Sequence, residues 1–458
     1  MQVHTNLISS RNSGQIVPID DNMNCSSSIP SNGLLRIKSN RLQLIVLRCI
    51  FFAALISIIL VTYFIFSRDH SSSSSSSDNQ ASTIKVSSTI TQFPTYVTTP
   101  MSTKSSLTLS GQKCQSFSFD PYVSYSSNNK PWSIAFGDFN RDNHLDIVIS
   151  KTENYELGLY FGFGNGTFAA QTTISAGSTL FYVTTADLNN DNYTDIITVE
   201  ASDNRVGVFF GHGDGTFDRR KTFPTGYYPY WVDTGDFNGD GNTDMITANS
   251  YDNTVTLLLG DGRGNFATQR NITAGDIVTG VVVADFNLDN HLDFAVTEFR
   301  DYTMSVFLGT GSGLFQARQS FSTEKNPWGL ASGDFNGDKY MDIVVVNQRA
   351  DSISVFINNR NGTFQSQMVY STDAPAISVA VGDMNNDTYI DIIVANDYKN
   401  YVGIYRGFGN GSFDFPMKFY TDWWILFVAT GDFNGDHRPD IAVLSEYTEA
   451  MNILLNSC

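Results

Sequence analysis

The sequence predicts an all-β fold in which one four-stranded unit is repeated seven times, and three observations support this prediction. An acidic phrase, GDFNGDGNTD at residues 235–244, recurs at a spacing of 49 residues, and four short β-rich runs separated by turn residues fill each interval. No helical pattern of useful length occurs after residue 114. Seven repeats of this period, each with four strands, are typical of a seven-bladed β-propeller. The first aspartates of the copies are Asp138, Asp187, Asp236, Asp285, Asp334, Asp383 and Asp432.

The first 113 residues differ in composition from the repeats. Residues 49–66 are apolar or weakly polar, and together with the residues from 42 onward they could cross a roughly 30 Å hydrocarbon core as a helix. Arg36, Lys38, Arg41 and Arg48 precede or begin this segment, so the positive-inside rule predicts a cytosolic N-terminus. A cleaved signal peptide and a buried core helix are the alternatives, and the forty polar residues ahead of the apolar run argue against the first.

We therefore expect four parts along the chain. These are a cytosolic tail at 1–41, a transmembrane signal anchor at 42–66, a Ser/Thr-rich stalk at 67–113 and a propeller at 114–458. This order predicts a single-pass plasma membrane protein whose propeller is extracellular. The net charge of −18 argues against nucleic acid and against docking on anionic lipid, because both carry the same sign of charge.

A second phrase lies between the third and fourth runs of the repeats, for example GFGNGTF at 162–168 and GHGDGTF at 211–217. Asn-Gly and Asp-Gly tolerate the positive φ that tight hairpins require. Together the two phrases resemble the FG-GAP and VCBS repeats of the integrin α-subunit propeller, over residues 114–458. The resemblance implies a seven-bladed propeller with calcium loops on one face. We do not expect an integrin subunit, because the apolar segment precedes the propeller and all seven loops are intact.

The acidic loop has the composition of a calcium site. Its shared pattern, Asp-x-Asn-x-Asp-x-x-x-Asp, supplies three carboxylates, an amide oxygen and the main-chain carbonyl of the seventh residue. An all-oxygen set suits Ca²⁺, or less well Mg²⁺, and lacks the cysteine and histidine side chains that Zn²⁺ prefers. The alternative is an Asp/Asn-rich turn without an ion. We expect up to seven structural calcium ions.

The predicted calcium ligands are, loop by loop, Asp138, Asn140, Asp142, His144 and Asp146; Asp187, Asn189, Asp191, Tyr193 and Asp195; Asp236, Asn238, Asp240, Asn242 and Asp244; Asp285, Asn287, Asp289, His291 and Asp293; Asp334, Asn336, Asp338, Tyr340 and Asp342; Asp383, Asn385, Asp387, Tyr389 and Asp391; and Asp432, Asn434, Asp436, Arg438 and Asp440.

Cys114 and Cys458 are expected to form a disulfide at the seam of the ring. They lie 344 residues apart, one more than seven repeats of 49, so they are neighbours in repeat coordinates. The segment beginning at Cys114 would then supply the outer strand of the blade whose inner strands end the chain. Exported cysteine pairs oxidise readily, and two free thiols are the alternative.

The five tryptophans, Trp132, Trp231, Trp328, Trp423 and Trp424, are predicted to lie just before the innermost strand of a blade, which places them on the face opposite the acidic loops. They either pack between blades or form a ligand surface, and we predict a ligand at Trp132, Trp231, Trp328 and Trp424. Predicted glycosylation sites gather on the other face or on an outer strand. They are Asn165, Asn192, Asn271, Asn361, Asn386 and Asn410.

No Ser–His–Asp, Cys–His or paired-carboxylate arrangement is distinct from the repeat, so we do not expect an enzyme. The predicted function is extracellular recognition or adhesion, with a protein or a glycan as ligand. A structural surface module without a specific ligand is the first alternative. An enzyme that acts on extracellular polymers is the second, because a propeller fold by itself does not decide function.

Overall fold

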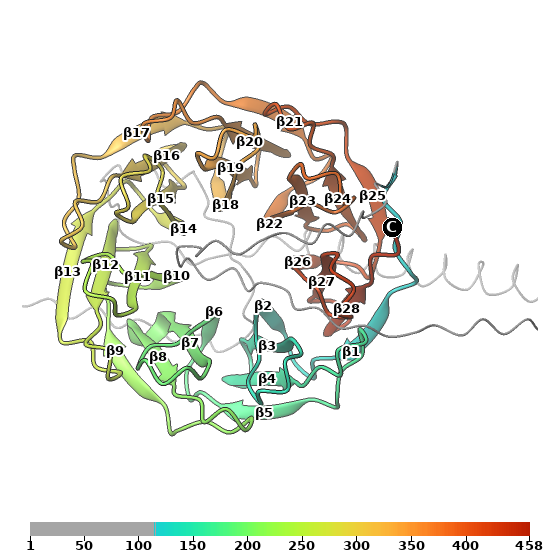
Figure 1. The fold of residues 1–458 in the computed structure, drawn as a ribbon, viewed down its shortest axis with the longest axis horizontal. Coiled ribbons are helices and arrows are strands. Elements are labelled where there is room, and N and C mark those ends of the chain that lie inside the picture. Colours follow the sequence, from blue (N-terminus) through green and yellow to red (C-terminus); the bar gives the residue numbers. More distant parts are fainter. Residues whose placement is uncertain (1–113, 115) are drawn as a thin grey trace, which may run out of the picture. The chain divides into compact units, whose positions relative to one another are not determined.

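The computed structural model describes Cys114 and residues 116–458, and this part of the chain is the all-β propeller that the repeats predict. Seven four-stranded antiparallel sheets, the blades, form a ring around a central axis (Figure 1), and we call the region along this axis the central channel. The only helix in the described residues is a short 3-10 turn, η1 (Ala201–Asp203). None of their helices is long and apolar enough to cross a membrane. The predicted tail, anchor and stalk lie outside the described residues.

Each blade runs from an inner strand beside the channel to an outer strand at the rim (Figure 1). The blades, from inner to outer strand, are as follows. Blade 1 contains β2 (Pro131–Gly137), β3 (Asp146–Lys151), β4 (Glu156–Tyr160) and β5 (Thr172–Ser175); blade 2 contains β6 (Leu180–Ala186), β7 (Asp195–Glu200), β8 (Arg205–Phe209) and β9 (Lys221–Pro224); blade 3 contains β10 (Pro229–Gly235), β11 (Asp244–Asn249), β12 (Thr254–Leu259) and β13 (Thr268–Thr273). Blade 4 contains β14 (Val278–Ala284), β15 (Asp293–Glu298), β16 (Thr303–Phe307) and β17 (Gln319–Ser322); blade 5 contains β18 (Pro327–Gly333), β19 (Asp342–Asn347), β20 (Ser352–Phe356) and β21 (Met368–Ser371). Blade 6 contains β22 (Ala376–Gly382), β23 (Asp391–Asn396), β24 (Tyr401–Tyr405) and β25 (Met417–Tyr420); blade 7 contains β26 (Ile425–Gly431), β27 (Asp440–Ser445), β28 (Ala450–Leu454) and β1 (Val123–Ser126).

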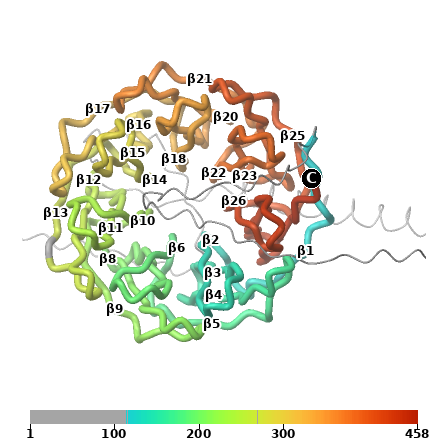
Figure 2. Tube along the Cα trace, in the orientation of Figure 1, coloured from blue at the N-terminus to red at the C-terminus, as the bar shows by residue number. Residues whose placement is uncertain are grey.

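Blade 7 joins the two ends of the described chain, as the repeat register predicts. The N-terminal strand β1 pairs antiparallel with β28, with Val123 opposite Ile453, so the first strand completes the last blade. Figure 2 shows the cyan start of the propeller, with β1, beside its red C-terminal end. Cys114 is bonded to Cys458 in a disulfide at this seam. The ring is therefore closed both by a sheet and by a covalent bond.

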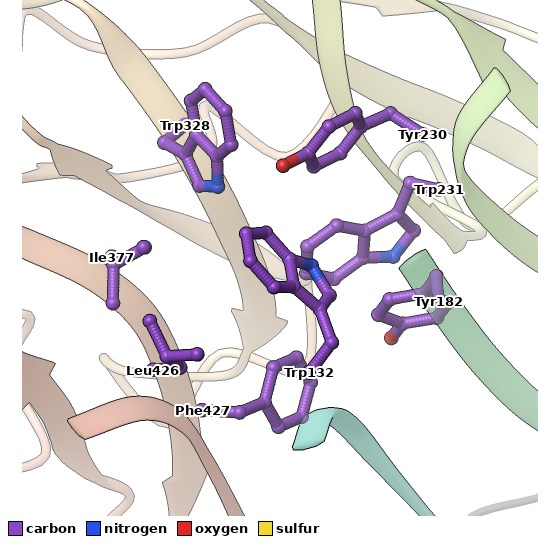
Figure 3. A pocket seen from close by; sticks show the side chains of 8 residues that line it. All are labelled: Trp132, Tyr182, Tyr230, Trp231, Trp328, Ile377, Leu426 and Phe427. Carbon is purple, nitrogen blue, oxygen red and sulfur yellow. The ribbon is translucent and has the colours of Figure 1, made fainter. Parts of the chain in front are cut away.

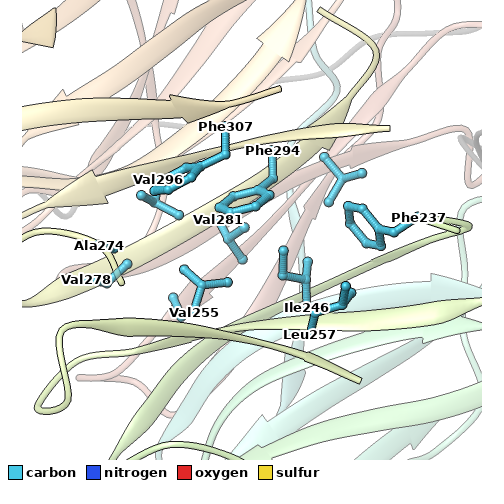
Figure 4. Close-up of a cluster of buried hydrophobic side chains, with 12 residues drawn as sticks. Phe237, Ile246, Val255, Leu257, Ala274, Val278, Val281, Phe294, Val296 and Phe307 are labelled. Atoms are coloured by element: carbon cyan, nitrogen blue, oxygen red, sulfur yellow. The ribbon is translucent and has the colours of Figure 1, made fainter. Parts of the chain in front are cut away.

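The second strand of every blade is buried on both of its faces, and the core lies between neighbouring blades. Figure 4 shows one such layer, in which Phe237, Ile246 and Leu257 of blade 3 pack against Val281 and Phe294 of blade 4. Because each blade covers its neighbour, no single blade buries its own apolar face.

At several boundaries between blades, the acidic loop of one blade contacts the glycine-rich turn of the next blade. The phenylalanine after the first loop aspartate packs edge-on against the phenylalanine that ends the glycine-rich turn of the next blade. Phe237, for example, lies 5.9 Å from Phe315 between ring centroids, and Phe335 lies 5.3 Å from Phe413. The phrases recur together because they are the two halves of one contact.

Candidate functional site

The acidic loops connect the first and second strands of each blade. Because the strands are antiparallel, the turns between the third and fourth strands lie at the same end, which we call the acidic face. The turns between the second and third strands, and the connections between blades, lie at the other end. We call that end the aromatic face, because exposed aromatic residues such as Tyr398, Trp424 and Tyr447 lie there.

The ninth residue of each loop is a buried aspartate that holds the two phrases of its blade together. In blade 3, Asp244 is fully buried and accepts hydrogen bonds from the N–H of Phe237 over 3.0 Å and from the N–H of Gly260 over 2.7 Å. The first donor lies in the acidic loop and the second begins the glycine-rich turn. The same two bonds recur in all seven blades. This structural role was not predicted from the sequence.

The first and fifth aspartates organise the loop backbone around themselves. Asp236 accepts N–H groups from Gly239, Asp240 and Gly241, and Asp240 accepts the N–H of Asn242 over 2.9 Å. The amide of Asn238 donates to Asp240. The carboxylates are thus fixed by main-chain donors at one edge of the loop.

These carboxylates are close enough to influence one another. Burial raises the pKa of Asp244 to about 7, the N–H groups of Gly260 and Phe237 oppose this shift, and the charges of Asp240 and Asp236 add to it. The same causes act on the ninth aspartate of the other six loops, Asp146, Asp195, Asp293, Asp342, Asp391 and Asp440. Each loop therefore concentrates negative charge around a buried carboxyl group.

The donor set of the loop fits a hard divalent cation, since it consists of carboxylate, amide and carbonyl oxygens. Among the described residues, however, no group of three or more histidine, cysteine, aspartate or glutamate side chains is arranged as a metal-binding cluster. The loop carboxylates are instead oriented by the hydrogen bonds described above. The predicted ligands thus lie together on each loop, and the calcium ion itself remains a prediction.

In three of the seven blades an arginine pairs with a loop aspartate, a contact that was not predicted from the sequence. Only Arg438 lies in the loop itself. Arg360 pairs with Asp338 in blade 5, and Arg406 pairs with Asp387 in blade 6 over 3.2 Å. In blade 7, Arg438 pairs with Asp436 over 2.9 Å. Burial acts to raise the pKa of Asp338, but the hydrogen bonds from Arg360 and Tyr340 and the arginine charge lower it overall. These arginines neutralise part of the charge that a metal ion would neutralise.

Three of the four tryptophans predicted to bind ligand meet at the mouth of the central channel (Figure 3). Trp132 lies 6.5 Å from Tyr230, whose ring lies 5.1 Å from Trp328, and Trp231 stacks on Tyr182 at 4.1 Å between ring centroids. The side chains leave a cavity of about 20 Å³, room for about one water molecule. They fill the channel at this level rather than line an open pocket.

Trp424 does not join these tryptophans. Its ring lies 5.7 Å from Tyr398 and 5.7 Å from Tyr447, both on turns between second and third strands. Trp424 precedes β26, as predicted, but the same prediction is wrong for Trp132, Trp231 and Trp328, which lie within the inner strands because each strand already begins at a preceding proline. Tyr398 and Tyr447 were not among the residues predicted from the sequence, although their spacing of one repeat is a signal that could have identified them.

All six asparagines of the predicted glycosylation sites are exposed. Asn165, Asn361 and Asn410 lie in glycine-rich turns and Asn192 and Asn386 in acidic loops, all on the acidic face. Asn271 lies on the outer strand β13. Their modification remains a prediction.

Comparison with protein families gives one match. The family model for the FG-GAP-like repeat matches residues 187–247, 236–296, 290–345, 334–394 and 383–443, which together cover more than half of the chain. No curated protein matches the chain.

Solved structures resemble the chain in fold. A chain from the crystal structure of BBS1N in complex with ARL6DN, soaked with mercury, matches with a TM-score of 0.55 and 12% identity, over 74% of this chain and 96% of that one. An Agrocybe aegerita lectin that recognises non-reducing terminal N-acetylglucosamine has a TM-score of 0.49 and 18% identity, over 69% and 85%. Virginiamycin B lyase from Staphylococcus aureus has a TM-score of 0.49 and 12% identity, over 74% and 99%. At sequence identities this low, the similarity shows that the folds are alike and shows nothing about function.

Proposed function

The chain belongs to the FG-GAP-like repeat family, and from this premise we propose that it is a recognition or adhesion module that binds an extracellular protein or glycan. One observation carries the proposal: large aromatic side chains are exposed together on the aromatic face. Aromatic residues are enriched at protein interfaces, and exposed ones on a rigid scaffold form good contact sites. The eight residues, each at least 36% exposed, are Tyr155, Tyr227, Tyr251, Tyr302, Tyr398, Trp423, Trp424 and Tyr447.

The position of the seam supports a ligand on the aromatic face. The N–H of Cys114 donates to the carbonyl of Asn385, which lies in the acidic loop of blade 6. The described part of the chain therefore begins at the acidic face, and the asparagines of five predicted glycosylation sites lie on that same face. The opposite, aromatic face carries none of these asparagines.

We also propose that calcium stabilises the acidic face. The first, third, fifth and ninth residues of each loop, with the seventh carbonyl, would hold the ion, which would supply the positive charge that balances three carboxylates. The chain's own residues already orient those carboxylates through main-chain donors. The role of the ion would be structural.

The test displays the full chain on cells and measures adhesion to arrays of extracellular matrix proteins and glycans. One variant replaces Tyr227, Tyr398, Trp423 and Tyr447 by serine. A control variant replaces Phe415 and Tyr420, which are 90% and 65% exposed at the rim, by serine. Loss of adhesion in the first variant alone supports the proposal. Equal adhesion by the wild-type chain and both variants would refute a ligand on the aromatic face.

A further inference from the structure

Trp424, Tyr398 and Tyr447 form an open corner of three rings, which we call the aromatic corner. The rings of Tyr398 and Tyr447 stand at 87° and 72° to the ring of Trp424. Tyr398 is 59% exposed, Tyr447 is 68% exposed and Trp424 is 38% exposed. The two tyrosine rings therefore stand at steep angles to the tryptophan ring, and all three rings are exposed to solvent.

Two carboxylates belong to the residues next to these tyrosines, and of the two Asp397 is buried and Glu446 is partly buried. Asp397 precedes Tyr398, and Glu446 precedes Tyr447 at the same position one repeat later. Asp397 accepts the N–H of Tyr398 over 2.8 Å, while the N–H of Glu446 donates to the carbonyl of Trp424 over 3.0 Å. The dipeptides at this repeat position in the other five blades lack the acid–tyrosine pair: Thr152–Glu153, Ala201–Ser202, Ser250–Tyr251, Phe299–Arg300 and Gln348–Arg349.

The two carboxylates differ in their partners: Glu446 pairs with Lys130, whereas Asp397 forms no ion pair among the described residues. Burial raises the pKa of Asp397 to about 6, and the charge of Glu446 adds to this shift. The charge of Asp397 is in turn the largest cause of the raised pKa of Tyr398. Lys130 lies 3.0 Å from Glu153 but 3.7 Å from Glu446, so it is shared between two acids. Lys399 is the other lysine beside the corner, and it is exposed.

The backbone holds the corner in an uncommon conformation. Trp424 and Tyr398 both have φ of 58°, in the left-handed region that bulky residues rarely adopt. The N–H of Trp424 donates to the carbonyl of Lys399, which ties the connection before β26 to the turn of blade 6. The position of Trp424 in the repeat has a similar φ in three other blades, at Tyr228, Ile277 and Asn326, so this conformation belongs to the connection between blades and fixes where the Trp424 side chain begins.

We propose that the aromatic corner binds a lysine or arginine side chain of a partner protein, with the aliphatic stem against the rings and the cationic head near Asp397 and Glu446. A cation over an aromatic face is attracted by the ring quadrupole, and two nearby carboxylates add charge complementarity. This inference rests on the proposed recognition function and names the chemistry of the ligand. A sugar would also stack on Trp424, but it would gain less from the two carboxylate charges.

The test immobilises Gly-Ser-X-Ser-Gly peptides at high density, with lysine, arginine or norleucine as X, and measures binding of the full chain. Norleucine has the apolar stem of lysine without its charge. We expect lysine and arginine peptides to retain the chain about tenfold more strongly than the norleucine peptide. The double variant Asp397→Asn/Glu446→Gln and the variant Tyr447→Ala should lose this preference.

Two matched controls separate the corner from general effects. Asp218→Asn/Asp414→Asn removes two exposed carboxylates elsewhere and should keep the preference, which excludes a mere response to net charge. Tyr251→Ala changes the equivalent tyrosine of blade 3, where Ser250 replaces the acid, and should also keep it. A melting temperature close to that of the wild type shows that a variant has folded.

Three results would overturn the inference. The first is equal retention on the lysine and norleucine peptides, and the second is an equal loss of the lysine preference in the Asp218→Asn/Asp414→Asn control. The third is binding of N-acetylglucosamine that Trp424→Ala abolishes. If the four-serine variant described above loses adhesion while the corner variants do not, the inference fails and the proposed function stands. If none of these variants affects adhesion, the proposed function fails as well.

Discussion

Arg360 donates a hydrogen bond from Nε to Oδ2 of Asp338 over 2.9 Å, so an arginine shares the fifth carboxylate of the acidic loop in blade 5. Arg406 and Arg438 make the equivalent contact in blades 6 and 7, whereas among the described residues no arginine or lysine forms an ion pair with the loop aspartates of blades 1–4. The loops therefore share one pattern but differ in charge.

This difference predicts unequal calcium affinities. The loops of blades 1–4 should bind the ion more tightly, because no side-chain cation competes with it there. Calorimetric titration of the full chain should resolve two classes of site, and substituting Arg360, Arg406 and Arg438 by alanine should merge them. A single class in the unmodified chain, or no change in the variant, would contradict the prediction.

Removal of calcium should destabilise the propeller. With free ion tenfold above its dissociation constant, each bound ion stabilises the fold by about 1.4 kcal/mol, and several ions act together. Excess chelator should lower the melting temperature and speed up proteolysis at the acidic loops. If melting curves with calcium and with chelator coincide, the ion has no structural role.

Asp244→Ala should destabilise the chain even in chelator. The variant leaves the buried N–H groups of Phe237 and Gly260 without an acceptor, at a cost of about 1–3 kcal/mol for each. Asp240→Ala, at an exposed position of the same loop, serves as the control and should have a small effect once calcium is removed. Equal melting temperatures of the two variants in chelator would show that the buried aspartate acts only through the ion.

Cys114→Ser should weaken the closure of the ring. Loss of a native disulfide typically costs about 2–5 kcal/mol, although the pairing of β1 with β28 still holds the seam together. Chemical denaturation should show a lower midpoint, with β1 the first region to lose protection in hydrogen exchange. Alkylation of both cysteines in the unreduced wild-type chain would instead reveal free thiols.

Acidification should weaken lysine binding at the aromatic corner. Burial and the charge of Glu446 raise the pKa of Asp397 to about 6, so Asp397 gains a proton as the pH falls from about 7.5 to about 5. The pKa of Glu446 is also raised by burial, against the opposing effect of Lys130. The other titratable groups around the corner are Glu153, Lys399, Tyr398 and Tyr447.

Retention on the lysine peptide should therefore fall several-fold over this range, and Asp397→Asn should flatten the dependence. Retention that is independent of pH in the wild-type chain would argue against a contribution from Asp397.

Much of the fold followed from the period alone. A spacing of 49 residues gave the number of blades, and the excess of one residue between Cys114 and Cys458 placed them as neighbours at the seam. The period also assigned each loop to a face, because antiparallel strands return to the same end at every second turn. These conclusions require only the order of the strands and turns along the chain, and the repeat shows that order directly.

The partners of individual side chains could not be obtained in this way. The ninth aspartate looked like a metal ligand in the sequence, and only the structure showed that two N–H groups, seven residues before it and sixteen after it, bond to its carboxylate. Those donors are brought together by the closure of the blade. Repetition by itself does not show where a given N–H group points.

The sequence by itself determined a seven-bladed all-β ring, its seam and the acidic loops on one face, because these depend on periodicity, alternation and turn chemistry. Only the tertiary structure decided that Trp132, Trp231 and Trp328 fill the channel while Trp424 stands with Tyr398 and Tyr447. The first three lie within inner strands that face the channel, whereas Trp424 precedes its strand with a left-handed backbone that turns its ring toward the neighbouring blade. A position in the repeat fixes the blade and the face, but the direction of a side chain depends on local φ and on which blade packs beside it.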